Sequence, residues 1–266
     1  MSLNAPQAAP PYVPAHGLLK GRSVLITAAA GGGIGFAAAR RCLEEGARAL
    51  MLSDIHPRRT AEAAEALAKE FPEAQVHGQV GNVAVEADVQ ALVDAAEEKL
   101  GGVDVLINNA GLGGSKRVVD MSDEDWHKVL DVTLTGTFRM TRAMLKKMQP
   151  RGRGAIVNNA SVLGWRAQKE QAHYAAAKAG VMALTRCSAL EAADYGVRIN
   201  AVSPSIVFHE HLRKSAPEAL LKELAGKEAF GRGAEAWEIA NLMVFLASDY
   251  ASYLVGETIS ASSQRA

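Results

Sequence analysis

The sequence has only two cysteines and no long apolar run. Cys42 and Cys187 lie far apart in segments with helical periodicity, which excludes a disulfide framework and indicates buried or half-buried thiols in a reducing compartment. No stretch reaches the roughly eighteen apolar residues that a membrane-spanning helix needs. Residues 1–19 are rich in proline and lack the basic and apolar regions of a secretory signal, so we expect a flexible tail and a cytoplasmic protein.

The sequence also lacks an excess of either charge. Lys and Arg number 29, as do Asp and Glu, which excludes a broad basic surface for nucleic acid and an electrostatic attraction to anionic membranes. A small-molecule partner fits this balance better. The 266 residues, 48% of them hydrophobic, suffice for one well-packed domain, expected at 20–266, and are few for two.

Short aliphatic runs alternate with longer helical patterns from about Arg22 onward, which is typical of a parallel sheet covered by helices on both faces. We predict strands at 22–28, 48–53, 74–80, 103–107, 154–160, 197–203 and 255–260. We predict helices at 34–46, 58–70, 84–100, 122–149, 172–195 and 235–248, and a helical or mobile stretch at 209–229. The predicted fold is a Rossmann-like, doubly wound α/β domain with a seven-stranded parallel sheet, in which ligands bind outside the carboxyl ends of the strands.

A glycine-rich segment follows the first predicted strand. Residues 28–35 read Ala-Ala-Ala-Gly-Gly-Gly-Ile-Gly and lead directly into the first predicted helix. Glycine permits a tight turn and lets the backbone approach a pyrophosphate at a helix N-terminus, where free N–H groups favour anions. The predicted contacts are Gly31, Gly33, Ile34 and Gly35.

Asp54 ends the second predicted strand, nineteen residues after Gly35. A carboxylate there can accept hydrogen bonds from the adenosine ribose, whereas a 2′-phosphate would meet a negative charge. The next residue is Ile55, so NAD(H) is favoured over NADP(H). Arg58 and Arg59 are near enough in sequence to turn toward a phosphate, although a solvated helix start is the commoner fate of such residues.

Tyr174 and Lys178 are four residues apart in an alanine-rich segment, and Ser161 precedes the tyrosine by thirteen residues. In a helix this spacing puts the phenol and the ammonium on one face, where a nearby cation lowers the pKa of the phenol toward working pH. A surface Tyr and Lys on an alanine-rich helix would show the same spacing.

Several motifs in combination resemble the short-chain dehydrogenase/reductase family over about residues 20–262. The motifs are the glycine loop, Asp54, Asn108-Asn109-Ala110-Gly111, Ser161, Tyr174-x-x-x-Lys178 and Asn200-Ala201-Val202-Ser203-Pro204. Within the family, the segments 158–166 and 203–206 are most similar to actinobacterial members associated with steroid-ring degradation.

The resemblance implies a role for each matching residue. Tyr174 exchanges a proton with the substrate oxygen, Lys178 lowers the pKa of Tyr174 and bonds the nicotinamide ribose, and Ser161 orients the same oxygen. Further dinucleotide contacts are implied at Asn82, Val83, Asn109, Ala110, Gly111, Tyr174, Lys178, Pro204, Ile206 and Val207.

The sequence departs from the family pattern at several positions. An asparagine that holds a relay water in the family is Thr133 here, and we expect Thr133 to take part in proton relay. The first glycine of the loop is replaced by alanine, at Ala28 or Ala29. An aspartate near the adenine is replaced by Asn82, whose amide oxygen can accept the same hydrogen bond.

Substrate specificity is expected to come from residues 162–173 and from a lid at about 205–230. Trp165 and Phe208 offer apolar area for a bulky alicyclic or steroid-derived alcohol or ketone. Arg166 and Lys169 offer charge for a carboxylate or a phosphate-bearing handle such as coenzyme A, with solvated surface charge as the alternative.

No metal site is expected, because His209 and His211 lack further ligands nearby. Family members pair the helices corresponding to 122–149 and 172–195 about two-fold axes, so we expect a homotetramer or homodimer.

The leading interpretation is an NAD-dependent alcohol dehydrogenase or ketone reductase. A β-ketoacyl thioester reductase would use the same catalytic group. Enoyl reduction is disfavoured, because related enoyl reductases space Tyr and Lys farther apart. A catalytically idle dinucleotide sensor is the alternative from another class, suggested by Thr133 and the altered glycine loop.

Overall fold

Short aliphatic and β-branched runs form one seven-stranded parallel sheet in the computed structural model, which describes residues 7–208 and 218–263. The strands are β1 Ser23–Thr27, β2 Ala49–Asp54, β3 Gln75–Val80, β4 Val105–Asn108, β5 Gly154–Asn159, β6 Val197–Pro204 and β7 Thr258–Ala261. Their order is β3-β2-β1-β4-β5-β6-β7, and every pairing is parallel. The predicted doubly wound α/β fold is confirmed.

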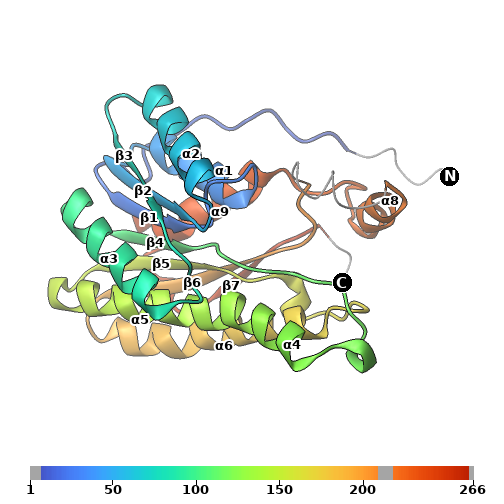
Figure 1. Ribbon diagram of the computed structural model, residues 1–266. Coiled ribbons are helices and arrows are strands. Elements are labelled where there is room, and N and C mark those ends of the chain that lie inside the picture. Colours follow the sequence, from blue (N-terminus) through green and yellow to red (C-terminus); the bar gives the residue numbers. More distant parts are fainter. Residues whose placement is uncertain (1–6, 209–217, 264–266) are drawn as a thin grey trace.

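Helices cover both faces of this sheet (Figure 1). The α-helices are α1 Ile34–Glu44, α2 Pro57–Glu70, α3 Glu86–Leu100, α4 Asp123–Leu130, α5 Gly136–Met148, α6 Ala172–Ala193, α8 Glu218–Lys227 and α9 Ala236–Ala247. Helices α1, α2 and α9 lie on one face, and α3 to α6 lie on the other. No described helix has the length and apolarity required to cross a lipid bilayer.

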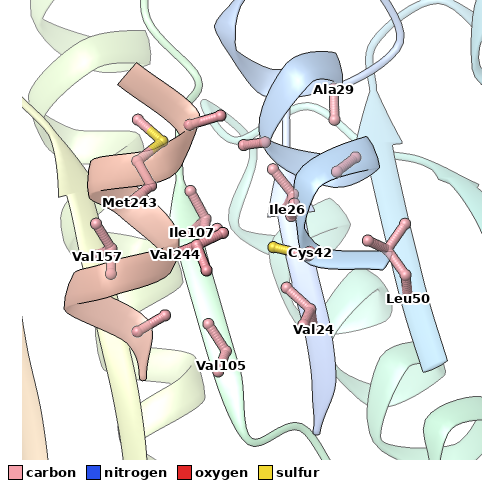
Figure 2. Packing of buried hydrophobic residues seen from close by; sticks show 14 of the residues in the cluster. Val24, Ile26, Ala29, Cys42, Leu50, Val105, Ile107, Val157, Met243 and Val244 are labelled. Atoms are coloured by element: carbon pink, nitrogen blue, oxygen red, sulfur yellow. The ribbon is translucent and has the colours of Figure 1, made fainter. Parts of the chain in front are cut away.

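The core forms on both faces of the sheet because side chains alternate along each strand. On β1, Val24 and Ile26 pack under α1 and α9, and Leu25 packs on the opposite face. Figure 2 shows the first of these layers, with Cys42 of α1 buried among valines and isoleucines. The second cysteine, Cys187, is exposed on α6, and both thiols are free.

The helix predicted at 122–149 is interrupted. After α4, residues Asp131–Thr135 form a π-helical turn, and α5 begins at Gly136. The extra residue in this turn comes where the Thr133 side chain bonds to the backbone of Leu112, 21 positions earlier. A π-turn of this kind is a local insertion that helical periodicity does not reveal.

Part of the tail predicted to be flexible, residues 12–18, is hydrogen-bonded to the end of α1. Glu45, at the end of α1, is fully buried and accepts hydrogen bonds from the backbone of His16 and Leu18 at 2.9 Å. Arg41 bonds Glu45 at 2.6 Å and donates to the carbonyl of Val13. The backbone of this stretch satisfies two buried charges. The flexibility of residues 1–19 stays a prediction.

The predicted lid is only partly described. Residues 206–208 lie beside Ala234, with hydrogen bonds from Phe208 N to Ala234 O and from Ala234 N to Ile206 O. Helix α8 falls within the stretch predicted at 209–229. His209 and His211 lie outside the described residues.

Candidate active site

The order of the strands reverses between β1 and β4, which opens a crevice at their carboxyl ends. A cavity of about 510 Å³ lies there, above β1, β2, β3 and β4. Its lining includes Ala28, Asp54, Asn82, Val83 and Gly111, all of which the sequence analysis places at or beside the dinucleotide.

The glycine loop brings the backbone close to this cavity. Gly33 is the N-cap of α1, and among the described residues no side chain caps the helix or places acid in its first turn. A Cβ at Gly35 would collide with the Ala28 carbonyl and the Asn109 amide, so only glycine fits. The free N–H groups of Ile34 and its neighbours therefore suit an anion.

Ala28, and not Ala29, has the backbone conformation expected of the glycine that is replaced. Its φ is +52°, a left-handed conformation that glycine adopts without steric cost and alanine does not. Gly31 is open, since a Cβ there would meet nothing within 4 Å. The glycine loop therefore contains one strained residue, Ala28, and its contacts with a dinucleotide stay predictions.

Asp54 lies at the end of β2 beside the cavity. Its carboxylate accepts a hydrogen bond from His56 N at 3.2 Å and is 3.8 Å from Nη2 of Arg59. Arg58 instead pairs with Glu62 on α2, at 3.7 Å. Of the two arginines at the start of α2, Arg59 therefore faces the Asp54 carboxylate and Arg58 does not.

Asn82 and Val83 follow β3 at the same cavity. The Asn82 side-chain oxygen accepts a hydrogen bond from Ala84 N at 3.0 Å, which leaves its second lone pair for another donor. Val83 is buried against Gly136, where a Cβ would lie 2.7 Å from Cγ2 of the valine. The start of α5 and the predicted adenine side of the site are therefore in contact.

The segment after β4 is hydrogen-bonded to the end of β1. Asn109 donates from Nδ2 to the carbonyls of Thr27 and Ala28, at 3.2 and 3.0 Å. The backbone N–H groups of Asn109 and Ala110 donate to the Thr27 hydroxyl. Gly111 comes next and faces Lys178, because a Cβ there would lie 3.4 Å from Nζ.

Ser161, Tyr174 and Lys178 come together at the carboxyl ends of β4 and β5. Ser161 Oγ accepts a hydrogen bond from Leu163 N at 3.2 Å, and its hydroxyl is near enough to the phenol of Tyr174 to lower the pKa of that phenol. Lys178 is buried; its Nζ donates to the backbone carbonyl of Asn159 at 2.5 Å and lies 5.5 Å from the centre of the Tyr174 ring.

Burial is the largest influence on the pKa values of Tyr174 and Lys178. Burial raises the pKa of Tyr174, and the hydrogen bond with Ser161 is the interaction that lowers it. The lowering of that pKa by Lys178 stays a prediction. Burial lowers the pKa of Lys178 itself from 10.5 to about 8.

Thr133 is fully buried next to this group. Its hydroxyl accepts from Leu112 N at 2.9 Å and donates to Leu112 O at 3.1 Å. The only proton that the hydroxyl can donate is thus used on the backbone. The structure places Thr133 as a support for the loop after β4, and a role in proton relay stays a prediction.

The predicted substrate residues lie on two segments. Trp165 is 52% exposed after the short helix that follows Ser161. Arg166 is half-buried beside it. Phe208 packs on Gly233, where a Cβ would lie 2.9 Å from the ring. Pro204 ends β6, and Ile206 and Val207 follow it at the start of the predicted lid.

The segment around Gly113 and Gly114 also borders this site, and no residue pattern described above predicts it. Gly113 lies next to Tyr174, and Gly114 lies against the buried His173, since added Cβ atoms would be 4.0 Å from the tyrosine ring and 2.8 Å from Nε2 of the histidine. Gln171 donates to the Gly114 carbonyl at 2.6 Å. The two glycines that follow Gly111 in the sequence were the one indication that the backbone passes close to other residues there.

The uncapped glycine turn, the carboxylate after β2 and the lysine facing Gly111 fit a dinucleotide laid across the ends of the strands. Together with the fold, they define a nicotinamide-dependent oxidoreductase. The chain belongs to the short-chain dehydrogenase/reductase family. A sequence model of the family described as Enoyl-(Acyl carrier protein) reductase matches residues 28–263.

Three known proteins show how similar the chain is to other members. It is 58% identical over 258 residues to (5R,7aS)-5-hydroxy-7a-methyl-1-oxo-2,3,5,6,7,7a-hexahydro-1H-indene-carboxyl-CoA reductase of Mycobacterium tuberculosis, covering 96% of this chain and 97% of that one. It is 34% identical to a 3alpha-hydroxysteroid dehydrogenase of Mediterraneibacter gnavus, covering 91% and 96%. The crystal structure of a short chain dehydrogenase from Mycobacterium smegmatis matches with a TM-score of 0.86 and 54% identity, covering 97% and 99%.

Proposed function

We propose that this enzyme transfers hydride between NAD(H) and a secondary alcohol or ketone on a bulky alicyclic, steroid-derived body that is carried as a coenzyme A thioester. The observation that carries the proposal is the Ser161, Tyr174 and Lys178 group beside the cavity at the carboxyl ends of the strands. The substrate class is supported by the relative that acts on an indene-carboxyl-CoA and by the hydroxysteroid dehydrogenase.

The residues of the site are suited to moving a proton at the substrate oxygen. When bound, the nicotinamide supplies or accepts the hydride. Burial raises the pKa of Tyr174, so its phenol is protonated at neutral pH and is ready to protonate an oxygen that gains negative charge during reduction. Ser161, whose hydroxyl interacts with the phenol, stabilises charge at the same oxygen.

Asp54 supports NAD over NADP. Its carboxylate ends β2 beside the cavity, where a ribose hydroxyl can donate to it and a 2′-phosphate would be repelled. Arg59, the nearest arginine, faces that carboxylate at 3.8 Å.

Arg166 and Lys169 support a thioester handle. Both follow the Ser161 segment, on the same loop as the exposed ring of Trp165. A coenzyme A chain carries phosphates that cations bind, while the apolar ring suits the alicyclic part of the substrate.

The test is a spectrophotometric screen of cyclic and steroid-derived alcohols and ketones, free and as coenzyme A thioesters, with each dinucleotide. We expect turnover with NAD(H) and a preference for the thioesters. Better turnover of an acetoacetyl thioester with NADPH would instead favour the β-ketoacyl reductase. NADH binding without turnover of any substrate would favour the sensor.

The control for this screen is Tyr174→Phe. We expect kcat to fall by roughly a hundredfold or more, because the variant has no phenolic proton to exchange. NADH affinity, measured by fluorescence, should change little. Activity close to that of the unaltered enzyme would contradict the role of the tyrosine.

The chain is also proposed to work as a homotetramer in the cytoplasm. Free thiols at Cys42 and Cys187 support a reducing compartment. Exposed apolar side chains on α5 and α6, Phe138 and Leu190, support the pairing of these helices between subunits.

A further inference from the structure

Asn159 lies between Lys178 and Asn109, and it is hydrogen-bonded to both. It is the last residue of β5, and its backbone carbonyl accepts the hydrogen bond from the Lys178 ammonium. Its side-chain Nδ2 donates to Oδ1 of Asn109 at 3.0 Å. Asn109 in turn donates to the carbonyls of Thr27 and Ala28. A row of amides therefore joins the lysine, through β5 and β4, to the glycine loop after β1.

The orientation of each amide in this row follows from the one before it. The carbonyls of Thr27 and Ala28 can only accept, so Asn109 must turn its NH₂ toward them. Its oxygen then faces Asn159, which must present an NH₂ as well. This arrangement leaves Oδ1 of Asn159 buried with no hydrogen-bond partner among the described residues. An unpaired buried acceptor is unfavourable, so the bond to Asn109 is made at the expense of the Asn159 oxygen.

The glycine loop needs such support at Ala28. An alanine with φ of +52° is strained by its Cβ, and a strained residue persists only where its surroundings hold it. The bond from Asn109 to the Ala28 carbonyl is one restraint on this residue. The Ala29 N–H, bonded to Ser53 O at 3.0 Å, is another.

We propose that Asn159 is a positioning residue of the dinucleotide site: its bond to the Asn109 oxygen helps to keep the Asn109 amide on the Ala28 carbonyl, and so helps to hold Ala28 in its left-handed conformation. The proposal rests on the dinucleotide-dependent function proposed above. It adds a residue that bonds the support of the phosphate loop and not the loop itself. Without the donor on Asn159, the Asn109 amide loses the partner of its oxygen and keeps its two bonds to the Thr27 and Ala28 carbonyls, so it moves away from Ala28 more readily.

The first experiment measures NADH affinity directly, by fluorescence titration. Asn159→Val suits the end of a strand and removes the donor, and Asn159→Asp keeps the size while presenting only oxygens to Asn109. We expect the Kd for NADH to rise about five- to tenfold in Asn159→Val, equivalent to one hydrogen bond. The rise should be at least as large in Asn159→Asp.

A matched control separates positioning from general stability. Asn200 is a buried strand asparagine that donates to Leu254 O and accepts from Glu257 N. Asn200→Val loses an equivalent amide and should lower Tm, yet leave the Kd for NADH unchanged. If Asn200→Val raised the Kd as much as Asn159→Val, the effect would be one of stability, and the proposal would be overturned.

The second experiment tests the link to Ala28. Glycine adopts a positive φ without strain, so adding Ala28→Gly to Asn159→Val should bring the Kd back to within about twofold of the unaltered enzyme. A double variant as weak as Asn159→Val alone would overturn the link. An unchanged Kd in both Asn159 variants would overturn the proposal while leaving the proposed function intact. No NADH binding by the unaltered protein would overturn both.

Discussion

Lys178 is a buried ammonium with an unfavourable charge. Its described hydrogen bond goes to one backbone carbonyl, that of Asn159, and its proton is therefore held less tightly than in water. A charge buried in this way destabilises the fold and is retained where it has another use. Here the lysine faces Gly111 and the Tyr174 ring, where the proposed function needs a cation beside a bound ribose and the phenol.

The first prediction concerns pH and stability. Burial lowers the pKa of Lys178 from 10.5 to about 8, so between these values the unfolded chain binds a proton that the folded chain has lost. The destabilisation is complete below pH 8, and stability rises with pH across the window. In denaturant titrations from pH 7 to 10, the stability of the unaltered protein should rise relative to that of Lys178→Met. A difference that does not vary with pH would contradict this.

The second prediction concerns Thr133. Replacing it by valine leaves the backbone of Leu112 without its two hydrogen bonds, which should lower the free energy of unfolding by about 1–3 kcal/mol. Thr133→Ser keeps the hydroxyl and should lose much less. If Thr133→Val unfolded at the same denaturant concentration as the unaltered protein but had lost turnover, the relay role would be favoured over the structural one.

Among the elements, α1 supports two parts of the molecule. Its first turn packs at Gly35 against Ala28, which lines the dinucleotide cavity, and its last turn binds the N-terminal segment through Arg41 and Glu45. Burial raises the pKa of Glu45, but hydrogen bonds from Leu18 and His16 outweigh it, so the net shift is downward. The carboxylate therefore stabilises the fold above about pH 4.5 and less as the pH falls below it.

The third prediction follows from this anchor. Glu45→Gln should lower the free energy of unfolding at pH 7 by about 1–3 kcal/mol, because Arg41 and two backbone N–H groups lose a charged acceptor. Glu70→Gln is the control, since Glu70 bonds Arg40 on an exposed surface and its loss should change stability by about 0.5 kcal/mol or less. The effect of Glu45→Gln should shrink at pH 4. Equal effects of both substitutions at pH 7 would refute the anchor.

Elements with strong local patterns were predictable, and those that depend on distant contacts were not. The strand around Val24 and Leu25 shows in its apolar run, and Tyr174 and Lys178 show in their spacing. The break at Thr133 depends on Leu112, and the packing of residues 12–18 depends on charges of α1 that a helical pattern assigns to solvent. The partner of the Lys178 ammonium is a backbone carbonyl of β5, which residue types cannot indicate.

For the whole molecule, the fourth prediction is its assembly. The proposed homotetramer should give a mass of about 112 kDa by light scattering, four times the 28.1 kDa of the chain. Phe138 and Leu190 are 41% and 71% exposed on α5 and α6. Placing Asp at both positions should reduce the mass without changing the circular dichroism spectrum. A 28.1 kDa particle in the unaltered protein would exclude the assembly.

The two thiols give this molecule a natural site for a chemical label. Burial raises the pKa of Cys42, so little of the reactive thiolate forms there, while Cys187 is exposed on the helix that carries Tyr174. A maleimide dye should therefore attach at a single position without any engineering. If α6 pairs between subunits, that reaction should be slow at high protein concentration and faster on dilution, so the labelling rate itself becomes a measure of subunit dissociation.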